Sequence, residues 1–158
     1  MHGRRGGFTL IELLITLVIA GILVSIAIPN FSGLIQNNRL IAQTNSLVAD
    51  LNLARSEAVK RAARVSVAAV EGDWSQGWTV HVEPAAPGTL LRTTQATLDD
   101  LSIQANTVGA ITFLTSGAID GSKRCLTLSD SRNEDATRIV AIETTGRIDT
   151  KYRPGDCS

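Results

Sequence analysis

An apolar run near the start of the chain, from Phe8 to Ile28, constrains its fold more than any other feature. Glu12 is the only ionisable side chain within this run. A helix of about 21 residues is roughly 31 Å long, which is enough to cross the hydrocarbon core of a bilayer. A lone carboxylate in such a span costs about 2.5–3.5 kcal/mol on insertion scales, so its presence calls for a specific role.

Two common kinds of N-terminal segment account for part of this pattern. A generic membrane anchor would place Glu12 near its cytoplasmic end, where a carboxylate lies close to the lipid headgroups. A secretory signal peptide would use Arg4 and Arg5 as its basic region and Ser25-Ile26-Ala27 as its cleavage site. The signal peptide is disfavoured because the apolar run is longer than usual for one and contains an acid.

The residues from Gly7 to Glu12, Gly-Phe-Thr-Leu-Ile-Glu, resemble the class III signal of type IV pilins and type II secretion pseudopilins. The resemblance implies that a prepilin peptidase cuts between Gly7 and Phe8 and methylates the new amino terminus. It also implies that Glu12 neutralises the Phe8 amino group of a neighbouring subunit in a helical bundle. Because an unpaired buried charge is costly and a paired one is tolerated, this ion pair would favour the correct assembly register.

The charge distribution predicts how the chain lies in a membrane. Arg4 and Arg5 precede the apolar run, so the positive-inside bias keeps the leader cytoplasmic and sends the rest outward. We therefore expect a single pass through the inner membrane with a periplasmic head, and later a place in a pilus or pseudopilus. The chain has 15 basic and 15 acidic residues, and removal of the leader leaves 13 against 15, which does not demand nucleic acid as a bulk partner.

Cys125 and Cys157 are the only cysteines in the chain. In an oxidising periplasm we expect them to form a disulfide that holds the C-terminus against a strand. On the chain-entropy model this bond would stabilise the fold by roughly 3.5–4 kcal/mol. Two free thiols are the alternative.

Pro29 follows the apolar run and predicts a kink or a locally melted turn, because proline lacks an amide donor and disfavours a helical Ile28. Helical periodicity then resumes, and the recurring residues predict a packing face. They are Leu40, Thr44, Leu47, Leu51, Ala54, Ala58, Ala62 and Val65. The charged residues lie mostly off this stripe; they are Asp50, Glu57, Lys60, Arg61 and Arg64.

Short strand patterns separated by turn signals follow the helix. They predict strands at 65–70, 78–82, 90–93, 101–104, 111–114, 124–129 and 138–143. A long N-terminal helix followed by strands predicts an α+β fold in which the helix covers one face of an antiparallel sheet. The expected segments are a leader at 1–7, a transmembrane and assembly helix at 8–28, its amphipathic continuation at 29–64 and a β-rich head at 65–158.

Four further motifs look like those of the GspH/FimT group of minor pilins and minor pseudopilins. They are Ala54-Arg55-Ser56-Glu57-Ala58, Gly77-Trp78, Ile111-Thr112-Phe113 followed by Gly117, and Thr145-Gly146-Arg147. The resemblance implies a low-abundance subunit that initiates or caps a type IV pilus or a type II secretion pseudopilus; a major pilin is the less favoured alternative. The implied partners are other minor and major pilins or pseudopilins, the prepilin peptidase and the inner-membrane assembly machinery.

Enzymatic chemistry is disfavoured by what the sequence lacks. After processing, His81 would be the only histidine, and it alternates with valines on a predicted strand. The sequence has no Cys-x-x-Cys, no clustered metal ligands and no glycine-rich phosphate loop. We therefore expect no catalytic residue, no metal, no cofactor and no small-molecule substrate.

DNA capture by an uptake (competence) pilus is the alternative function. Arg147, Lys151 and Arg153 form a basic C-terminal segment, and Tyr152 between them offers a stacking face for a base. Some FimT-type minor pilins bind DNA through a Gly-Arg-x-Arg motif in a C-terminal loop. The corresponding residues here are Gly146-Arg147-Ile148-Asp149, so an acid replaces the second arginine.

Overall fold

The computed structural model describes residues 9–86, 88–95, 101–106 and 109–151, apart from the side chains of residues 26–32, 133–136 and 151. The chain divides into two compact units, Met1–Ile35 and Gln36–Ser158. The helix α1 (Leu10–Arg61) contributes its first half to the first unit and its second half to the second. The strands that the structure describes all belong to the second unit, which we call the head.

Both ends of α1 are closed by local hydrogen bonds. At its start the Thr9 carbonyl accepts from the backbone N–H of Leu13 at 3.2 Å. At its end Ala62 takes a positive φ of 48°, and the N–H of Ala63 reaches the carbonyl of Ala58 at 3.3 Å. This 6→1 bond is a Schellman-type cap. The helix therefore ends at Arg61, three residues before the predicted boundary.

The helix continues through Pro29. The locally melted turn that the sequence predicts at this proline is therefore absent from the described backbone, which is helical from Leu10 to Arg61. A proline inside a helix still removes one backbone donor and crowds the preceding turn. The kink at Pro29 stays a prediction.

The strands form two antiparallel sheets. The first has the order β3-β2-β1-β5 and contains β3 (Leu90–Gln95), β2 (Asp73–Val82), β1 (Val65–Val70) and β5 (Ile111–Phe113). The second has the order β4-β6-β7-β8 and contains β4 (Leu101–Ala105), β6 (Arg124–Asp130), β7 (Asn133–Ile142) and β8 (Ile148–Lys151). The sequence predicted one sheet, because strand patterns identify strands and not their partners.

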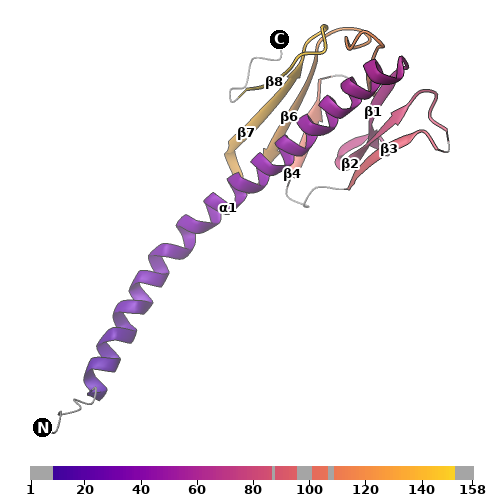
Figure 1. Ribbon diagram of the computed structural model, residues 1–158. Helices are drawn as coiled ribbons and strands as arrows, with labels where there is room; N and C mark the ends of the chain where they lie inside the picture. Colours follow the sequence, from indigo (N-terminus) through magenta and orange to yellow (C-terminus); the bar gives the residue numbers. More distant parts are fainter. Residues whose placement is uncertain (1–8, 87, 96–100, 107–108, 152–158) are drawn as a thin grey trace, which may run out of the picture. The chain divides into compact units, whose positions relative to one another are not determined.

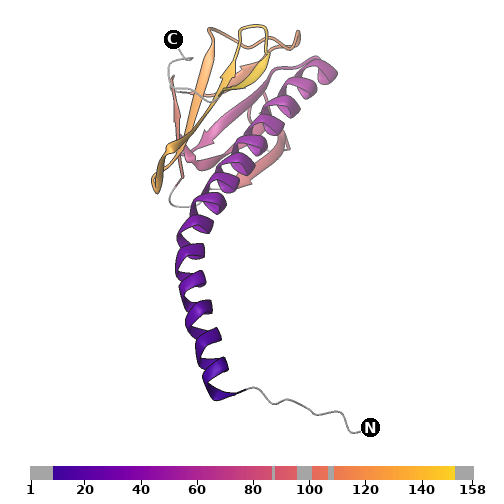
Figure 2. The same cartoon turned by 90° about the vertical axis from the view of Figure 1, so that its left-hand side faces the viewer.

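The C-terminal half of α1 packs against both sheets through one hydrophobic core. Figure 1 shows this half of the helix running beside strands of both sheets, and the turned view in Figure 2 agrees. The buried helix residues are Leu40, Leu47, Leu51, Ala54 and Ala58, and they meet Trp78 and Phe113 of the first sheet and Leu126 and Val140 of the second. The α+β class is confirmed, and so is the predicted packing stripe from Leu40 to Ala58. Ala62, which the prediction included, is exposed, because the helix ends at Arg61.

The strands differ most from the sequence-based prediction at β2, β7 and β8; the other predicted strands end within two residues of their predicted ends. β2 begins at Asp73 rather than near Trp78, and β7 begins at Asn133 rather than Arg138, because each forms a hairpin with the strand before it. β8 was not predicted. It pairs with β7 from Ile142↔Ile148 to Ile139↔Lys151, and its polar residues conceal it in a local pattern.

Candidate functional site

The first turn of α1 holds Glu12 in a capping arrangement. Thr9 precedes the helix, and its Oγ1 accepts a hydrogen bond from the backbone N–H of Glu12 at 3.3 Å. Thr9 and Glu12 have the Thr-x-x-Glu spacing of a capping box. The helix dipole also favours an acid in this turn. Glu12 thus has a local structural partner in Thr9, and its own side chain is exposed.

The rest of the first unit exposes large apolar side chains that would be buried in an ordinary soluble domain. Between Leu10 and Val24, eleven of them are at least 51% exposed. They are Leu10, Ile11, Leu13, Leu14, Ile15, Leu17, Val18, Ile19, Ile22, Leu23 and Val24. Monomeric soluble proteins rarely expose contiguous apolar surface of this extent, so the segment marks a contact with lipid or with other proteins.

The predicted processing site, Gly7 and Phe8, lies outside the described residues. Within the part of the chain that the structure describes, no helix is both long and apolar enough to cross a bilayer.

A buried carboxylate ties α1 to the first sheet. Asp50 is 2% exposed, and its Oδ2 accepts hydrogen bonds from Trp78 Nε1 at 2.9 Å and from Thr94 Oγ1 at 2.6 Å. Its Oδ1 accepts from Arg92 Nη1 at 2.7 Å. Each oxygen of a buried charge is therefore hydrogen-bonded, which is the condition under which such a charge is tolerated. The prediction that Asp50 lies off the packing stripe is wrong.

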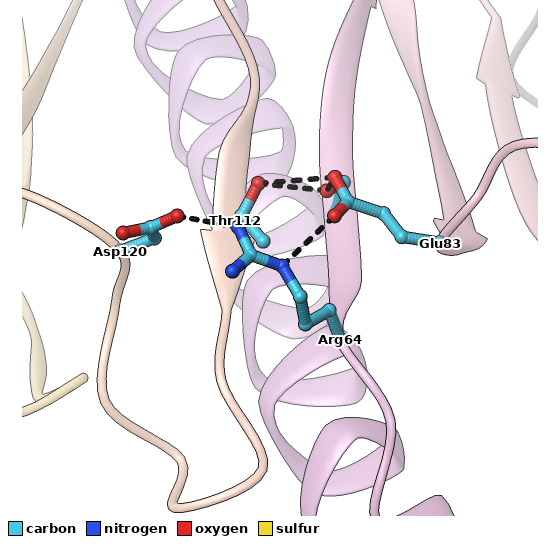
Figure 3. Close-up of polar contacts among 5 residues, drawn as sticks. Arg64, Glu83, Thr112 and Asp120 are labelled. Carbon is cyan, nitrogen blue, oxygen red and sulfur yellow. Dashed lines mark hydrogen bonds and ion pairs between the residues drawn. The ribbon is translucent and has the colours of Figure 1, made fainter.

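A second polar cluster joins the end of α1 to both edges of β1 (Figure 3). Arg64 donates through Nε to Glu83 at 3.0 Å and through Nη2 to Asp120. The buried hydroxyl of Ser66 donates to the Glu83 carboxylate and lies 2.8 Å from the hydroxyl of Thr112. The cluster connects the segment after the helix with β1, with the residue that follows β2, with β5 and with the loop that follows β5.

The cluster shifts the pKa of its members in opposite directions. The Ser66 hydroxyl, and after it the Arg64 guanidinium, hold the pKa of Glu83 below its ordinary value of 4.5. Asp120, followed by Glu83, raises the pKa of Arg64. Glu83 and Arg64 therefore stay ionised near neutral pH, and their contacts hold the chain together rather than leave either group free to transfer protons.

Arg55 of α1 joins two loops of the head, one containing Gly117 and the other containing Thr145. Its Nε donates to the carbonyl of Gly117 at 3.0 Å, and its Nη2 donates to the carbonyl of Thr145 at 3.4 Å. Gly146 has a φ of 79°, and a Cβ added to it would lie 1.9 Å from the Gly117 oxygen. Only glycine allows the two turns to approach so closely.

The basic residues proposed for DNA are only partly described. Arg147 follows Gly146, its side chain is 68% exposed, and its Nη2 lies 2.7 Å from Oδ2 of Asp149. Lys151 ends β8, but its side chain is outside the described residues, as is the whole of Arg153. The acid that replaces the second arginine of the Gly-Arg-x-Arg pattern therefore forms an ion pair with the first.

Two other predicted sites stay untested. Cys125 is buried on β6 at 2% exposure, and Cys157 lies outside the described residues, so their disulfide remains a prediction. His81 is partly buried on β2. Across the described residues, no group of three or more His, Cys, Asp and Glu side chains is placed to hold a metal ion.

Comparison with known families decides what kind of protein this is. A family model described as the type II transport protein GspH matches residues 43–146, which is more than half of the chain. The chain belongs to the GspH family. A second model, the prokaryotic N-terminal methylation motif, matches residues 3–28, which include Gly7, Phe8 and Glu12. A search of curated protein sequences found no match.

Solved structures agree with this family. The type IV minor pilin FimU of Pseudomonas aeruginosa is similar at 25% identity with a TM-score of 0.64, over 74% of this chain and 90% of FimU. The minor pseudopilin EpsH from the type 2 secretion system of Vibrio cholerae shares the fold, with a TM-score of 0.56 at 15% identity over 75% of this chain and 99% of EpsH.

This GspH-family chain is therefore a minor pilin or pseudopilin, a subunit of a type IV pilus or of a type II secretion pseudopilus. Its N-terminal motif marks a membrane-anchored subunit that assembles with other pilins and is a substrate of the prepilin peptidase. Proteins of this family are structural subunits and not enzymes. The predicted family, fold class and broad function are confirmed.

The structure explains why the GspH-like motifs occur in this chain. Arg55 of the first motif meets Gly117 and the Thr145-Gly146 turn, and Trp78 meets Asp50. Their shared role is to hold α1 and the loops together. The sequence missed Asp50 and the Ser66–Glu83 contact. Asp50 could have been found, since the order Leu47, Asp50, Leu51, Ala54 has the 3–4 spacing of the buried face.

Proposed function

We propose that this chain is cut between Gly7 and Phe8, is methylated at Phe8, and serves as a minor subunit that initiates a filament or lies near its tip. In this proposal the head lies in the periplasm, and the apolar segment crosses the inner membrane once with its amino terminus in the cytoplasm. Assembly moves this helix from lipid into the filament. The partners are other minor and major pilins or pseudopilins and the inner-membrane assembly machinery.

The observation that carries the proposal is the exposed apolar first unit with one acid at its start. Between Thr9 and Val24 every described side chain is exposed, and Glu12 is the only ionisable group among them. This surface suits lipid before assembly and neighbouring helices afterwards. In this proposal Glu12 lies within a few residues of the new amino terminus at Phe8. It therefore lies at the depth in the membrane where the amino terminus of a neighbouring subunit would enter the filament. A charge pair at this point would favour one alignment of neighbouring subunits, which is the role proposed for Glu12.

Two substitutions at Glu12 separate an assembly charge from a helix cap. Glu12→Gln keeps a side chain that functions in a capping box but removes the charge, and Glu12→Ala removes both. We expect both variants to insert into the membrane and to be cleaved, but not to be recovered in sheared filaments. Glu71→Ala, the same change as Glu12→Ala on an exposed turn of the head, is the control and should assemble normally. Normal recovery of Glu12→Gln in filaments would remove the charge from the assembly mechanism.

DNA capture is the alternative function, and one observation bears on it. Arg147 is exposed on a turn that Arg55 and Gly117 hold in place, so its position is well defined for a ligand. Its ion pair with Asp149 opposes the role, because a phosphate would have to displace a carboxylate. We therefore rank structural assembly first.

A further inference from the structure

Each sheet of the head has two edge strands, and three of these four edges are closed or charged. On β5, the backbone carbonyl of Thr112 accepts a hydrogen bond from the N–H of Asp120 at 2.8 Å. On β4, the N–H of Ile103 donates to Oγ of Ser75 at 3.0 Å. The four residues of β8 include an acid and a lysine. Side-chain caps and charges of this kind discourage an edge strand from pairing with another chain.

The fourth edge, β3 (Leu90–Gln95), is open on the side that faces away from β2 (Figure 1). Within the part of the chain that the structure describes, no backbone group is hydrogen-bonded to this side of the strand. β3 contains no proline and one charged residue, Arg92. Leu91 is an extra residue where the register shifts, but residues 92–95 pair with β2 without interruption. They therefore present a short row of unpaired N–H and C=O groups to which an extended chain can pair.

The open edge is held in place by the helix behind it. Arg92 Nη1 donates to Oδ1 of Asp50 at 2.7 Å, and Thr94 Oγ1 donates to Oδ2 of the same carboxylate at 2.6 Å. Asp50 is buried on α1, so two residues of β3 are anchored to the core of the head. A strand that is already fixed in its extended conformation loses little conformational entropy when another strand pairs with it.

Leu90 adds an exposed apolar side chain to this edge. It is 57% exposed, and among the described residues of the head one other large apolar side chain is more than half exposed. Thr79 and His81 flank the buried Val80 on β2, so both point to the face away from the core. With Leu90 they line a shallow hollow of about 370 Å³. In strand addition, main-chain hydrogen bonds supply affinity and such hollows for alternate side chains supply specificity.

The charge of β3 indicates what kind of strand it binds. The Arg92 side chain is 51% exposed although one of its nitrogens binds Asp50, and β3 contains no acid. The rest of the guanidinium can donate to a carboxylate on an adjacent strand. Opposite charges directly across from one another stabilise strand pairing, and like charges oppose it. An acidic residue in the added strand therefore complements this edge.

We propose that β3 binds an extended segment of another protein by strand addition, and that this segment places an acidic residue opposite Arg92 and an apolar residue beside Leu90. A second copy of this chain fits less well, because β3 offers no acid to a second Arg92. The docking surface is built by the head alone. It is a binding role in addition to the assembly role proposed for the apolar first unit.

Photo-crosslinking from β3 identifies the bound segment. A photo-crosslinking residue replaces the exposed Thr93 of the full-length chain in the cells that produce it. The expected product joins β3 to a non-helical segment of a different protein, with an acidic residue near the crosslinked position. Leu90→Glu should lower the yield of this product by about fivefold or more, and Leu90→Met, which stays apolar and similar in size, should change it less than about twofold. Because Leu90 is exposed, both variants should keep the wild-type melting temperature.

Hydrogen exchange then tests strand pairing directly. A synthetic copy of the crosslinked segment, added to the purified full-length chain in detergent micelles, should slow amide exchange in β3 and leave β8, another edge strand, unchanged. The same peptide with its acid replaced by the corresponding amide should bind about twofold or more weakly.

Four results would overturn the proposal. They are the absence of a product from Thr93, a product with β3 of a second copy, equal yields from Leu90→Glu and Leu90→Met, and unchanged exchange in β3. Neither measurement depends on filament assembly. Failure of strand addition therefore leaves the proposed assembly role standing, and failure of assembly leaves strand addition standing.

Discussion

The indole nitrogen of Trp78 donates a 2.9 Å hydrogen bond to Oδ2 of Asp50, and this bond joins the buried face of α1 to the centre of the first sheet. Both residues are almost fully buried. Arg92 and Thr94 of β3 bind the same carboxylate, so one acid holds two strands against the helix. The GspH-like Gly77-Trp78 motif is thereby explained by packing.

Replacement of Asp50 should destabilise the head strongly. Asp50→Ala leaves the buried N–H of Trp78 without its acceptor and removes two further hydrogen bonds, so we expect the free energy of unfolding to fall by about 3 kcal/mol. Urea unfolding of the soluble head, residues 36–158, measures the change. Ser46→Ala on the exposed side of the same helix should stay within about 0.5 kcal/mol of wild type. Equal stability of the two variants would contradict the role assigned to Asp50.

The close approach of two turns at Gly146 predicts a second, separable effect. Gly146→Ala adds a Cβ 1.9 Å from the Gly117 carbonyl oxygen at a φ of 79°. Gly72→Ala is the matched control, since Gly72 has a φ of 82° and a Cβ there meets nothing within 4 Å. The control should lose about 1–2 kcal/mol from backbone strain alone, and Gly146→Ala clearly more. If urea unfolding showed equal losses of unfolding free energy for the two variants, the two turns that Arg55 joins could move apart without destabilising the head, which would contradict this prediction.

Local patterns in the sequence predicted the helix and most strands, and nonlocal contacts account for what they missed. The stripe from Leu40 to Ala58 follows the helical period, and it is buried as predicted. Asp50 has the spacing of the buried face, but an acid is expected there only when its partners are known. Those partners, Trp78, Arg92 and Thr94, are 28–44 residues away in the sequence, so no local pattern identifies them.

The same limit applies to the sheets and to the DNA candidates. The sequence of β8 resembles a polar tail, and only its pairing with β7 identifies it as a strand. The division into two sheets depends on β4 pairing with β6, across about twenty residues that include β5. Asp149 could be read from the sequence as a departure from Gly-Arg-x-Arg, but its ion pair with Arg147 needed coordinates.

Acid should weaken the cluster around Glu83. The pKa of Glu83 is lowered in the folded head, so its carboxylate contributes stability above its ordinary value of 4.5, and this contribution is lost as the pH falls through that value and below. Glu83→Gln should therefore be less stable than wild type at pH 7, and the difference should shrink towards pH 3. Because Glu83 is about one-third exposed, we expect less than about 1 kcal/mol. A difference that grows on acidification would contradict this assignment.

The ion pair between Arg147 and Asp149 allows a direct test of DNA binding, the alternative function. Gel shifts with single-stranded DNA at several salt concentrations should show weak binding by the wild-type head, and Asp149→Asn should strengthen it by releasing Arg147. Charge reversal at Arg147, Lys151 and Arg153 should abolish binding that uses this segment. Asp120→Asn, which alters an exposed acid paired with Arg64, is the control. Binding that is unchanged by the triple reversal would end the uptake hypothesis for this site.

The account as a whole depends on where the mature chain begins, because Glu12 pairs with an amine only if that amine belongs to Phe8. Mass spectrometry of the N-terminal peptide, purified from membranes or filaments, measures this directly. We predict a peptide that begins at Phe8 and carries one added methyl group on its amino terminus. A mature chain that begins at Met1, after Ala27 or at any residue other than Phe8 would contradict the proposed assembly role.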